Sequence, residues 1–276
     1  ARPGVTTRLP LVADAEPRRR LSQIAARFHP RQPGFVAGVT GTNGKTSTAV
    51  FAASLWSMLG DKAGSIGTLG AHAPGFDRPL AHTTPEPVTL HETLDAMAGA
   101  GVTHLAMEVS SHALSQYRAD GVRFSAAAFT NLTQDHLDFH ETLEAYFEAK
   151  LRLFLDLLPA TGAAVVNMDG ERSAEVAAAA HRRGARVLTT GRRGDTLCIR
   201  SLAPKPSGLD LEVEARGQVF RLGLPLIGAF QAENALLAAG IVLASGRAAG
   251  EVLPLLDRLP GVPGRMQFAA QARGAG

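Results

Sequence analysis

The stretch Gly38–Thr48, GVTGTNGKTST, decides the fold of this chain. It follows a short apolar run that begins at Phe35, and it leads into a segment with helical character over 46–59. A strand, a glycine-rich turn and a helix in this order direct several backbone N–H groups at one spot. The positive end of the helix dipole lies behind the same spot. The sequence therefore predicts a phosphate-binding loop.

Individual residues of this loop suit a nucleotide. Gly41 and Gly44 carry no Cβ, so the backbone can fold closely around an anion. Lys45 can reach β- and γ-phosphate oxygens, and the Thr46 hydroxyl can bind Mg²⁺. The strict pattern for such loops has glycine where this chain has Val39, so the match fails at one position. The alternative is an ordinary strand–turn–helix with a surface lysine.

Size and composition indicate a folded, intracellular type of chain. The 276 residues are 45% hydrophobic and 19% charged, which is enough apolar material for one large domain or two ordinary ones. The net charge of +3 comes from short arginine clusters, and no aromatic-rich basic segment predicts nucleic-acid binding. Cys198 is the only cysteine, as expected in a reducing compartment. No apolar run is long enough to predict a membrane span, and no signal peptide is visible.

The chain alternates between predicted strands and predicted helices, which indicates an α/β fold with a mostly parallel sheet flanked by helices. A small antiparallel part is predicted over 197–224, beside the main sheet. We expect 1–34 to be the tail of a preceding domain, 35–260 a central ATP-binding domain, and 261–276 a linker. The predicted strands are 35–39, 102–109, 124–129, 163–166 and 186–188, and the predicted helices are 21–28, 46–59, 89–100, 143–158, 171–183, 231–244 and 248–259.

Residues with reactive side chains follow the ends of three predicted strands: Lys45, Glu108 and Asn131. The carboxyl ends of parallel strands meet at one edge of a sheet, where ligands bind. Glu108 closes an apolar strand, and a buried carboxylate is costly unless it is paired or binds a metal. Mg²⁺ suits it, and pairing with a lysine or with backbone groups is the alternative.

Lys150 lies at the edge of the apolar stripe of the predicted helix 143–158. A buried lysine tends to lose its proton, and a neutral amine can take up CO₂ to become a carbamate that binds metal. The spacing alone favours the other interpretation, a lysine whose ammonium group extends into solvent. His136 and His140 are four residues apart and share a face if their segment is helical. Caps or surface groups explain that segment equally well.

Taken together, these motifs resemble the Mur ligase family, most closely its MurE group. Members of that group add the third amino acid to UDP-N-acetylmuramoyl-L-Ala-D-Glu. The matching stretches, in family order, are GVTGTNGKTST at 38–48, TTP at 83–85, MEVSSHAL at 107–114, Gln116 with Arg118, FTNLTQDHLDFH at 129–140, YFEAK at 146–150, GAFQAENALLAA at 228–239 and PGRM at 263–266.

The resemblance implies roles for particular residues. It makes Lys45, Lys150 and His136 catalytic. It assigns ATP to Gly41, Thr42, Asn43, Gly44, Lys45, Thr46, Ser47, Asn131 and Asn234. It assigns the UDP-muramoyl dipeptide to Thr83, Thr84, Ser110, Gln116 and Arg118. It assigns Mg²⁺ to Thr46, Glu108, His136 and Lys150 as its carbamate. The family often has Asn where this chain has Gln231, which puts adenine contact there in doubt.

The resemblance also implies a reaction and a setting. The D-Glu γ-carboxylate attacks the γ-phosphate of ATP, and an incoming amine displaces phosphate from the acyl phosphate, so no nucleophilic Ser or Cys is needed. Diaminopimelate is favoured over lysine as the amine, and we expect a cytoplasmic monomer without nucleic-acid or membrane partners. Family members have further terminal domains, so we expect this fragment to bind nucleotide weakly and to be inactive alone. The alternatives are another Mur or folylpolyglutamate-type ligase, or a nucleotide-binding module without catalysis.

Overall fold

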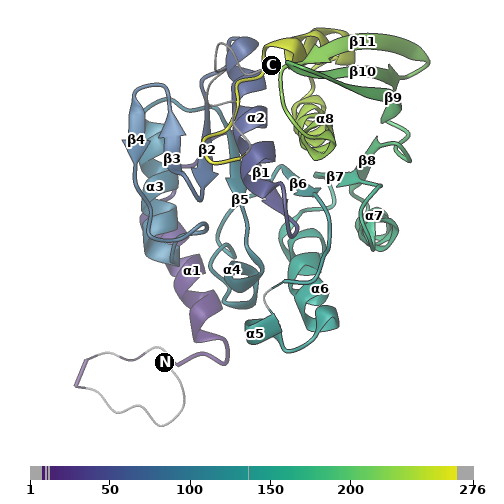
Figure 1. Ribbon diagram of the computed structural model, residues 1–276. Helices are drawn as coiled ribbons and strands as arrows, with labels where there is room; N and C mark the ends of the chain where they lie inside the picture. Colours follow the sequence, from purple (N-terminus) through teal and green to yellow (C-terminus); the bar gives the residue numbers. More distant parts are fainter. Residues whose placement is uncertain (1–7, 10, 12, 136, 266–276) are drawn as a thin grey trace.

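The computed structural model describes residues 8–265 except 10, 12 and 136. Its strands form one sheet in the order β11-β10-β9-β8-β7-β6-β1-β5-β2-β3-β4 (Figure 1). The strands are β1 Phe35–Thr40, β2 Ala63–Gly67, β3 Gly70–Ala73, β4 Phe76–Arg78, β5 His104–Glu108, β6 Ala126–Phe129, β7 Ala163–Asn167, β8 Arg186–Gly191, β9 Leu197–Lys205, β10 Gly208–Ala215 and β11 Gln218–Leu224.

The middle of the sheet is parallel and its two ends are antiparallel. Neighbouring strands from β9 to β2 are parallel, whereas β10 and β11 extend one end and β3 and β4 the other by antiparallel pairing. The predicted α/β class is therefore confirmed. The predicted antiparallel part over 197–224 is confirmed in β9 to β11. It continues the main sheet through the pairing of β8 with β9, so only its predicted position beside that sheet is wrong.

Helices cover both faces of the sheet (Figure 1). One core contains α2 and α8 against residues such as Val39 and Val165, and the other contains α3, α4, α6 and α7 against residues such as Val36 and Val166. Strand residues that alternate between two buried faces explain the nearly continuous apolar runs. The helices are α1 Pro17–Phe28, α2 Lys45–Met58, α3 Pro87–Gly99, α4 Ser111–Ser115, α5 Leu137–His140, α6 Leu143–Arg152, α7 Ser173–Arg182, α8 Ala229–Ala244 and α9 Ala249–Val252.

Two segments differ from the sequence-based prediction. Strands β2 to β4 were not predicted, because β2 is short, contains two glycines and is buried along its whole length. Such a strand has neither an alternating pattern nor a run of β-branched residues. The predicted helix 143–158 is α-helical only to Arg152 and continues as a π-helical turn, Leu153–Leu157. The predicted helix 248–259 likewise ends as a 3₁₀ turn, Leu253–Arg258.

Strand β1 lies between β5 and β6 at the centre of the sheet. The chain leaves β1 through α2 to reach β2, and it later returns to β5 and β6 on either side of β1. Open parallel sheets bind ligands beyond the carboxyl ends of strands at such a reversal. The phosphate-binding loop therefore occupies the position that the topology favours.

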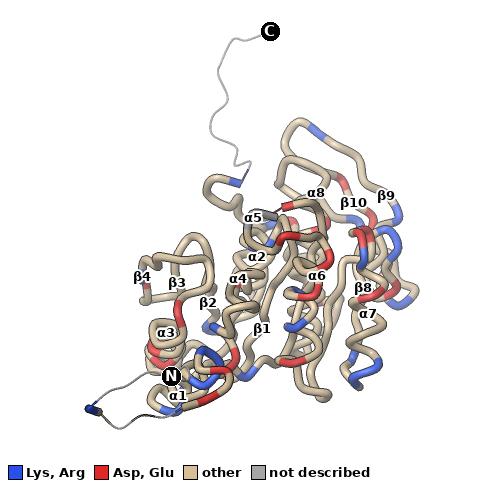
Figure 2. Tube along the Cα trace, turned by 90° about the horizontal axis from the view of Figure 1, so that it is seen from below, with Lys and Arg blue, Asp and Glu red and all other residues tan. Residues whose placement is uncertain are grey.

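Acidic and basic residues are interspersed along the chain trace (Figure 2). On the antiparallel ladder, Arg200 pairs with Glu214 and Arg221 pairs with Glu212. A balanced surface of this kind gives little long-range attraction for a polyanion. No helix in the described part of the chain is long and apolar enough to cross a membrane.

Candidate active site

The predicted phosphate-binding loop lies between β1 and α2, as the sequence indicated. Gly44 precedes the first residue of α2 and has a φ of 86°, in the left-handed region that favours glycine. A Cβ on Gly44 would lie 2.2 Å from Oδ1 of Asn234 in α8. The loop and α8 therefore approach each other more closely than any side chain at Gly44 would allow.

The residues after β6 brace this loop. The backbone carbonyl of Asn131 accepts a hydrogen bond from the Thr42 amide at 2.9 Å, and its Oδ1 accepts one from the Asn43 amide at 3.0 Å. The buried Tyr146 of α6 donates its hydroxyl hydrogen bond to Thr42 Oγ1 at 3.2 Å. Contacts from two other elements thus fix the loop before any ligand binds, which lowers the entropy cost of binding.

Two lysine amines converge on one carbonyl of the loop. Lys45 Nζ donates to the carbonyl oxygens of Gly41 at 3.0 Å and Thr42 at 2.7 Å, while Lys150 Nζ donates to the same Gly41 oxygen at 2.8 Å. Lys150 is only 1% exposed, and its amine lies 4.1 Å from the centre of the Tyr146 ring. The prediction of a solvent-reaching Lys150 is therefore wrong, because α6 packs directly beneath the loop.

Burial sets the proton affinity of these amines. It lowers the pKa of Lys45, although the charges of Glu108 and Asp135 act in the opposite direction. It lowers the pKa of Lys150 well below the ordinary lysine value, and the nearby charge of Lys45 lowers that pKa further. Lys150 is thus predisposed to be neutral, and a neutral amine is nucleophilic.

Glu108 lies across the same cleft, and it is 1% exposed. Its Oε1 accepts a hydrogen bond from the Thr68 amide at 2.8 Å, and its Oε2 accepts one from the Thr68 hydroxyl at 3.4 Å. A Cβ on Gly67 would lie 2.1 Å from Oε1, so the carboxylate packs directly against the end of β2. This geometry orients the carboxylate while most of its lone pairs remain available.

The cleft between the loop and Glu108 has a volume of about 270 Å³. Its lining includes the hydroxyl-bearing Thr46 and Thr68, the carboxylate of Glu108, and the cations Lys45 and Arg265. An oriented, buried carboxylate beside a hydroxyl is the oxygen donor set that Mg²⁺ prefers. The residues present therefore fit a magnesium ion bound together with phosphate oxygens.

The predicted substrate residues fall into two groups. Thr83 and Ser110 line the cleft, and Thr83 Oγ1 lies 3.1 Å from Thr68 Oγ1. Thr84 is 1% exposed, and its hydroxyl donates to the Glu108 carbonyl at 2.9 Å and accepts from the Ser110 amide at 3.0 Å. Thr84 thus fixes the path of the chain behind Glu108.

Gln116 and Arg118 bind each other on the turn after α4. Arg118 donates to Gln116 Oε1 at 3.1 and 2.7 Å and to the Thr84 carbonyl at 3.0 Å. It also pairs with Glu86 at 2.8 Å. This arginine therefore joins the TTP segment to the turn, as a fork-shaped guanidinium can.

A second cavity, of about 540 Å³, opens on the other side of Gly44. Asn131, Phe230 and Asn234 line it, and the Phe230 side chain is 45% exposed. Asn234 Nδ2 donates to Gln231 Oε1 at 3.0 Å, and Gln231 in turn donates to the Arg265 carbonyl at 3.1 Å. An exposed aromatic ring beside an amide suits a flat, polar ring such as a nucleobase.

Of the two histidines considered as metal ligands or surface groups, the structure describes the surroundings of His140. His136 lies outside the described residues. His140 is buried among the rings of His112, Phe139 and Tyr146. The part of the chain that the structure describes contains no group of three or more His, Cys, Asp and Glu residues able to hold a metal.

Sequence reasoning missed two residues of the cleft. Thr68 follows β2, which the pattern did not predict, although its setting between Gly67 and Gly70 indicates a tight turn. Arg265 belongs to the PGRM stretch, and its Nη2 donates to Thr46 Oγ1 at 3.4 Å. The signal for it was the matching PGRM stretch at 263–266, to which the resemblance assigned no role.

A glycine-rich loop lies between β1 and α2, two lysine amines bind its Gly41 carbonyl, and the buried carboxylate of Glu108 lines the cleft that it faces. These features define an α/β nucleotide-binding protein with a phosphate-binding loop. Residues 39–242 match the family model described as the Mur ligase middle domain. The chain therefore belongs to the Mur ligase family.

Similar proteins support this assignment in detail. The chain is 46% identical over 272 residues to UDP-N-acetylmuramoyl-L-alanyl-D-glutamate–2,6-diaminopimelate ligase of Bradyrhizobium diazoefficiens, covering 97% of this chain and 56% of the relative. It is 48% identical over 265 residues to the ligase of the same name from Caulobacter vibrioides, covering 94% and 54%. A solved structure of a ligase of that name matches with a TM-score of 0.84 and 30% identity, covering 95% of this chain and 54% of that one. The chain thus spans about half the length of its relatives.

Proposed function

We propose that the protein containing this chain is an ATP-dependent ligase that joins an amino acid to the D-Glu γ-carboxylate of UDP-N-acetylmuramoyl-L-Ala-D-Glu. The observation that carries the proposal is the placement of Lys150, whose buried amine lies 2.8 Å from the phosphate-loop carbonyl of Gly41. A lysine held there is costly for the fold. Its presence is explained if the neutral amine becomes a carbamate that binds a metal ion beside the triphosphate.

In this proposal the loop and its neighbours hold ATP by its phosphates. The amides at the start of α2 and the Lys45 ammonium bind the β- and γ-phosphate oxygens, because that end of the helix carries positive charge. Asn131, Phe230 and Asn234 bind the adenine in the second cavity. Lys45 turns from the Gly41 and Thr42 carbonyls to the nucleotide when ATP arrives.

The reaction has two steps. A γ-carboxylate oxygen attacks the γ-phosphorus, the bond from that phosphorus to the bridging oxygen breaks, and ADP leaves. The incoming amine then attacks the acyl carbon, phosphate leaves with the electron pair of the C–O bond, and the amine loses a proton as the amide forms. Negative charge develops on phosphoryl oxygens in both steps, so Lys45 and the loop amides act by electrostatic stabilisation.

Mg²⁺, when bound, would neutralise phosphate charge and act as a Lewis acid. Thr46 and Glu108 would hold one ion, and His136 belongs to the same proposed ligand set. We propose that Lys150 reacts with CO₂: its nitrogen lone pair forms the N–C bond, one C=O electron pair moves to oxygen, and a proton leaves the nitrogen. The resulting carbamate anion would help to hold a second ion.

The names of the relatives support diaminopimelate rather than lysine as the amine. We propose that Thr83, Ser110, Gln116 and Arg118 bind the UDP-muramoyl dipeptide, and that Thr84 positions them. We place the protein in the cytoplasm, where ATP is available as a co-substrate, and we propose that it acts as a monomer.

The full-length protein provides the test. Phosphate release is measured with ATP, Mg²⁺ and UDP-N-acetylmuramoyl-L-Ala-D-Glu, with diaminopimelate or lysine as the amine. We expect turnover with diaminopimelate that depends on all components. Turnover with a folate and glutamate instead, or no turnover in any combination, would contradict the proposal.

A further inference from the structure

The turn that carries Gln116 and Arg118 is held in a strained conformation. Tyr117, between these two residues, has a φ of 59°, in the left-handed region that L-residues with large side chains rarely adopt. Strained backbone of this kind persists only where surrounding contacts impose it. Two of these contacts are local ones of a helix end, because the Tyr117 amide donates to the Leu114 carbonyl at 3.2 Å and the Arg118 amide donates to the Ala113 carbonyl at 2.9 Å. The remaining contacts come from elements outside the cleft.

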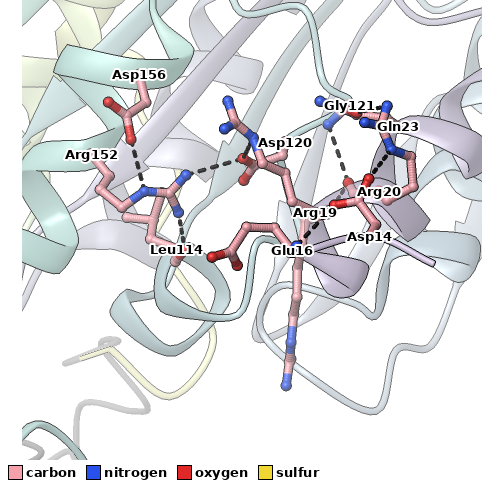
Figure 3. A network of polar contacts seen from close by, with 12 residues as sticks. Asp14, Glu16, Arg19, Arg20, Gln23, Leu114, Asp120, Gly121, Arg152 and Asp156 are labelled. Carbon is pink, nitrogen blue, oxygen red and sulfur yellow. Dashed lines mark hydrogen bonds and ion pairs between the residues drawn. The ribbon is translucent and has the colours of Figure 1, made fainter. Parts of the chain in front are cut away.

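Arg152, at the end of α6, holds the turn from one side (Figure 3). Its Nη1 donates to the Leu114 carbonyl, and its Nη2 donates to Asp120 Oδ1 at 3.0 Å. Its guanidinium carbon lies 4.5 Å from the centre of the Tyr117 ring. One side chain thus contacts the start, the middle and the end of the turn. The Asp120 carboxylate that it binds is 1% exposed.

Helix α1 holds the turn from the other side (Figure 3). Arg19 pairs with Asp120 Oδ1 at 3.1 Å. Ser22 donates its hydroxyl hydrogen bond to the Arg118 carbonyl at 3.0 Å and accepts one from the Gly121 amide at 3.2 Å. Arg152 and α1 thus bind backbone atoms of the turn and the Asp120 carboxylate. The Arg118 guanidinium still binds Gln116 and the Thr84 carbonyl.

We propose that Arg152, acting through Asp120, is a positioning residue for the substrate turn over 114–121. This inference rests on the proposed function of Gln116 and Arg118. Lys150 and Arg152 both belong to α6, so one helix would set the geometry of the phosphate site and of the substrate turn together. A shift of α6 would then move both parts of the site.

Kinetics of the full-length enzyme test the positioning role. Replacing Arg152 by Met keeps the aliphatic stem and removes every polar contact. We expect Arg152→Met to raise KM for the UDP-muramoyl dipeptide about tenfold, as for the loss of one or two hydrogen bonds, and to leave KM for ATP within about twofold. Arg152→Lys should recover part of the loss. Asp156→Asn is the matched control, because it removes the solvent-exposed partner of Arg152 and leaves the turn untouched.

Amide hydrogen exchange of the same variants without ligands tests the inference separately from the reaction. We expect faster exchange at amides of 114–121 in Arg152→Met and Asp120→Asn, and wild-type exchange in Asp156→Asn. Unchanged exchange in the first two variants, or an equal rise in both KM values, would overturn the inference. Absence of turnover in the wild-type enzyme would instead contradict the proposed function, and hydrogen exchange would still decide whether Arg152 holds the turn.

Discussion

Lys150 and Arg152 are two residues apart on α6, and their surroundings differ in kind. The described contacts of Lys150 are a carbonyl oxygen and an aromatic ring. Burial and the charge of Lys45 lower its pKa, and the charge of Asp135 opposes them only in part. The described contacts of Arg152 include two carboxylates, Asp120 and Asp156, and a backbone carbonyl. Both basic residues lie at the end of one helix, but of the two only Arg152 forms ion pairs with described residues.

The presence of ion pairs at Arg152 and their absence among the described contacts of Lys150 indicate a structural role for Arg152 and a functional role for Lys150. A buried charge beside an opposite charge costs the fold less than an isolated one does. Ionisable groups with strongly shifted pKa values are concentrated at functional sites. The comparison supports the proposals that Lys150 takes part in the reaction and that Arg152 shapes the site.

The largest expected effect is on catalysis at Lys150. Lys150→Met keeps the side-chain length and removes the amine, so no carbamate can form. We expect turnover of the full-length enzyme to fall about a thousandfold, as for other groups that stabilise developing charge. Phosphate release measures this loss. Lys205→Met on the β9–β10 hairpin is the control, and turnover near the wild-type rate in Lys150→Met would refute the assignment.

Stability should respond in opposite directions at the two positions. We expect Lys150→Met to leave the free energy of unfolding unchanged or to raise it, because an isolated buried amine is replaced by an apolar group. Arg152→Met should lower it by about 2 kcal/mol, since Asp120 keeps only Arg19 as a partner. Urea unfolding at neutral pH without Mg²⁺ measures both. A loss of stability in Lys150→Met as large as that in Arg152→Met would remove the distinction.

The pH dependence of stability sharpens the same contrast. The folded-state pKa of Lys150 lies well below the unfolded value of about 10.4. Between these two values the unfolded chain binds more protons at Lys150, so wild-type stability rises with pH in that window. Lys150→Met lacks this contribution. The amount by which its free energy of unfolding exceeds that of the wild type should therefore decrease from about pH 7 to about pH 10 in CO₂-free buffer. A constant difference between the two proteins would show that Lys150 is not neutral in the folded state.

The smallest expected effect is on Mg²⁺ binding at the Glu108 carboxylate. A Cβ in Gly67→Ala would meet Glu108 Oε1 at 2.1 Å and displace it. We expect the Mg²⁺ concentration for half-maximal turnover to rise about tenfold, the effect of about 1.4 kcal/mol in binding. Titration of the full-length enzyme with Mg²⁺ measures it. Gly250→Ala in α9, where a Cβ meets nothing within 4 Å, serves as control, and equal Mg²⁺ requirements in the two variants would count against a metal at Glu108.

Much of the fold was predictable because its signals are local. The strands and helices around Gly38–Thr48 have periodicities that a short window of sequence contains, and β1 and α2 lie within a residue of their predicted bounds. Strand β2 was missed because its small, uniformly buried residues have no period. The π-helical turn after Arg152 was missed because its apolar spacing is also that of an α-helix.

The sequence by itself determined the phosphate-binding loop, the alternation of strands and helices, and the set of residues able to do chemistry. Only the tertiary structure decided which of them are buried together. Lys150 Nζ meets the Gly41 carbonyl across 109 positions of sequence, and Gly67 meets Glu108 across two strands that are adjacent only in the folded sheet. Local propensity acts over a few residues, whereas burial and the pKa it shifts depend on packing between distant segments.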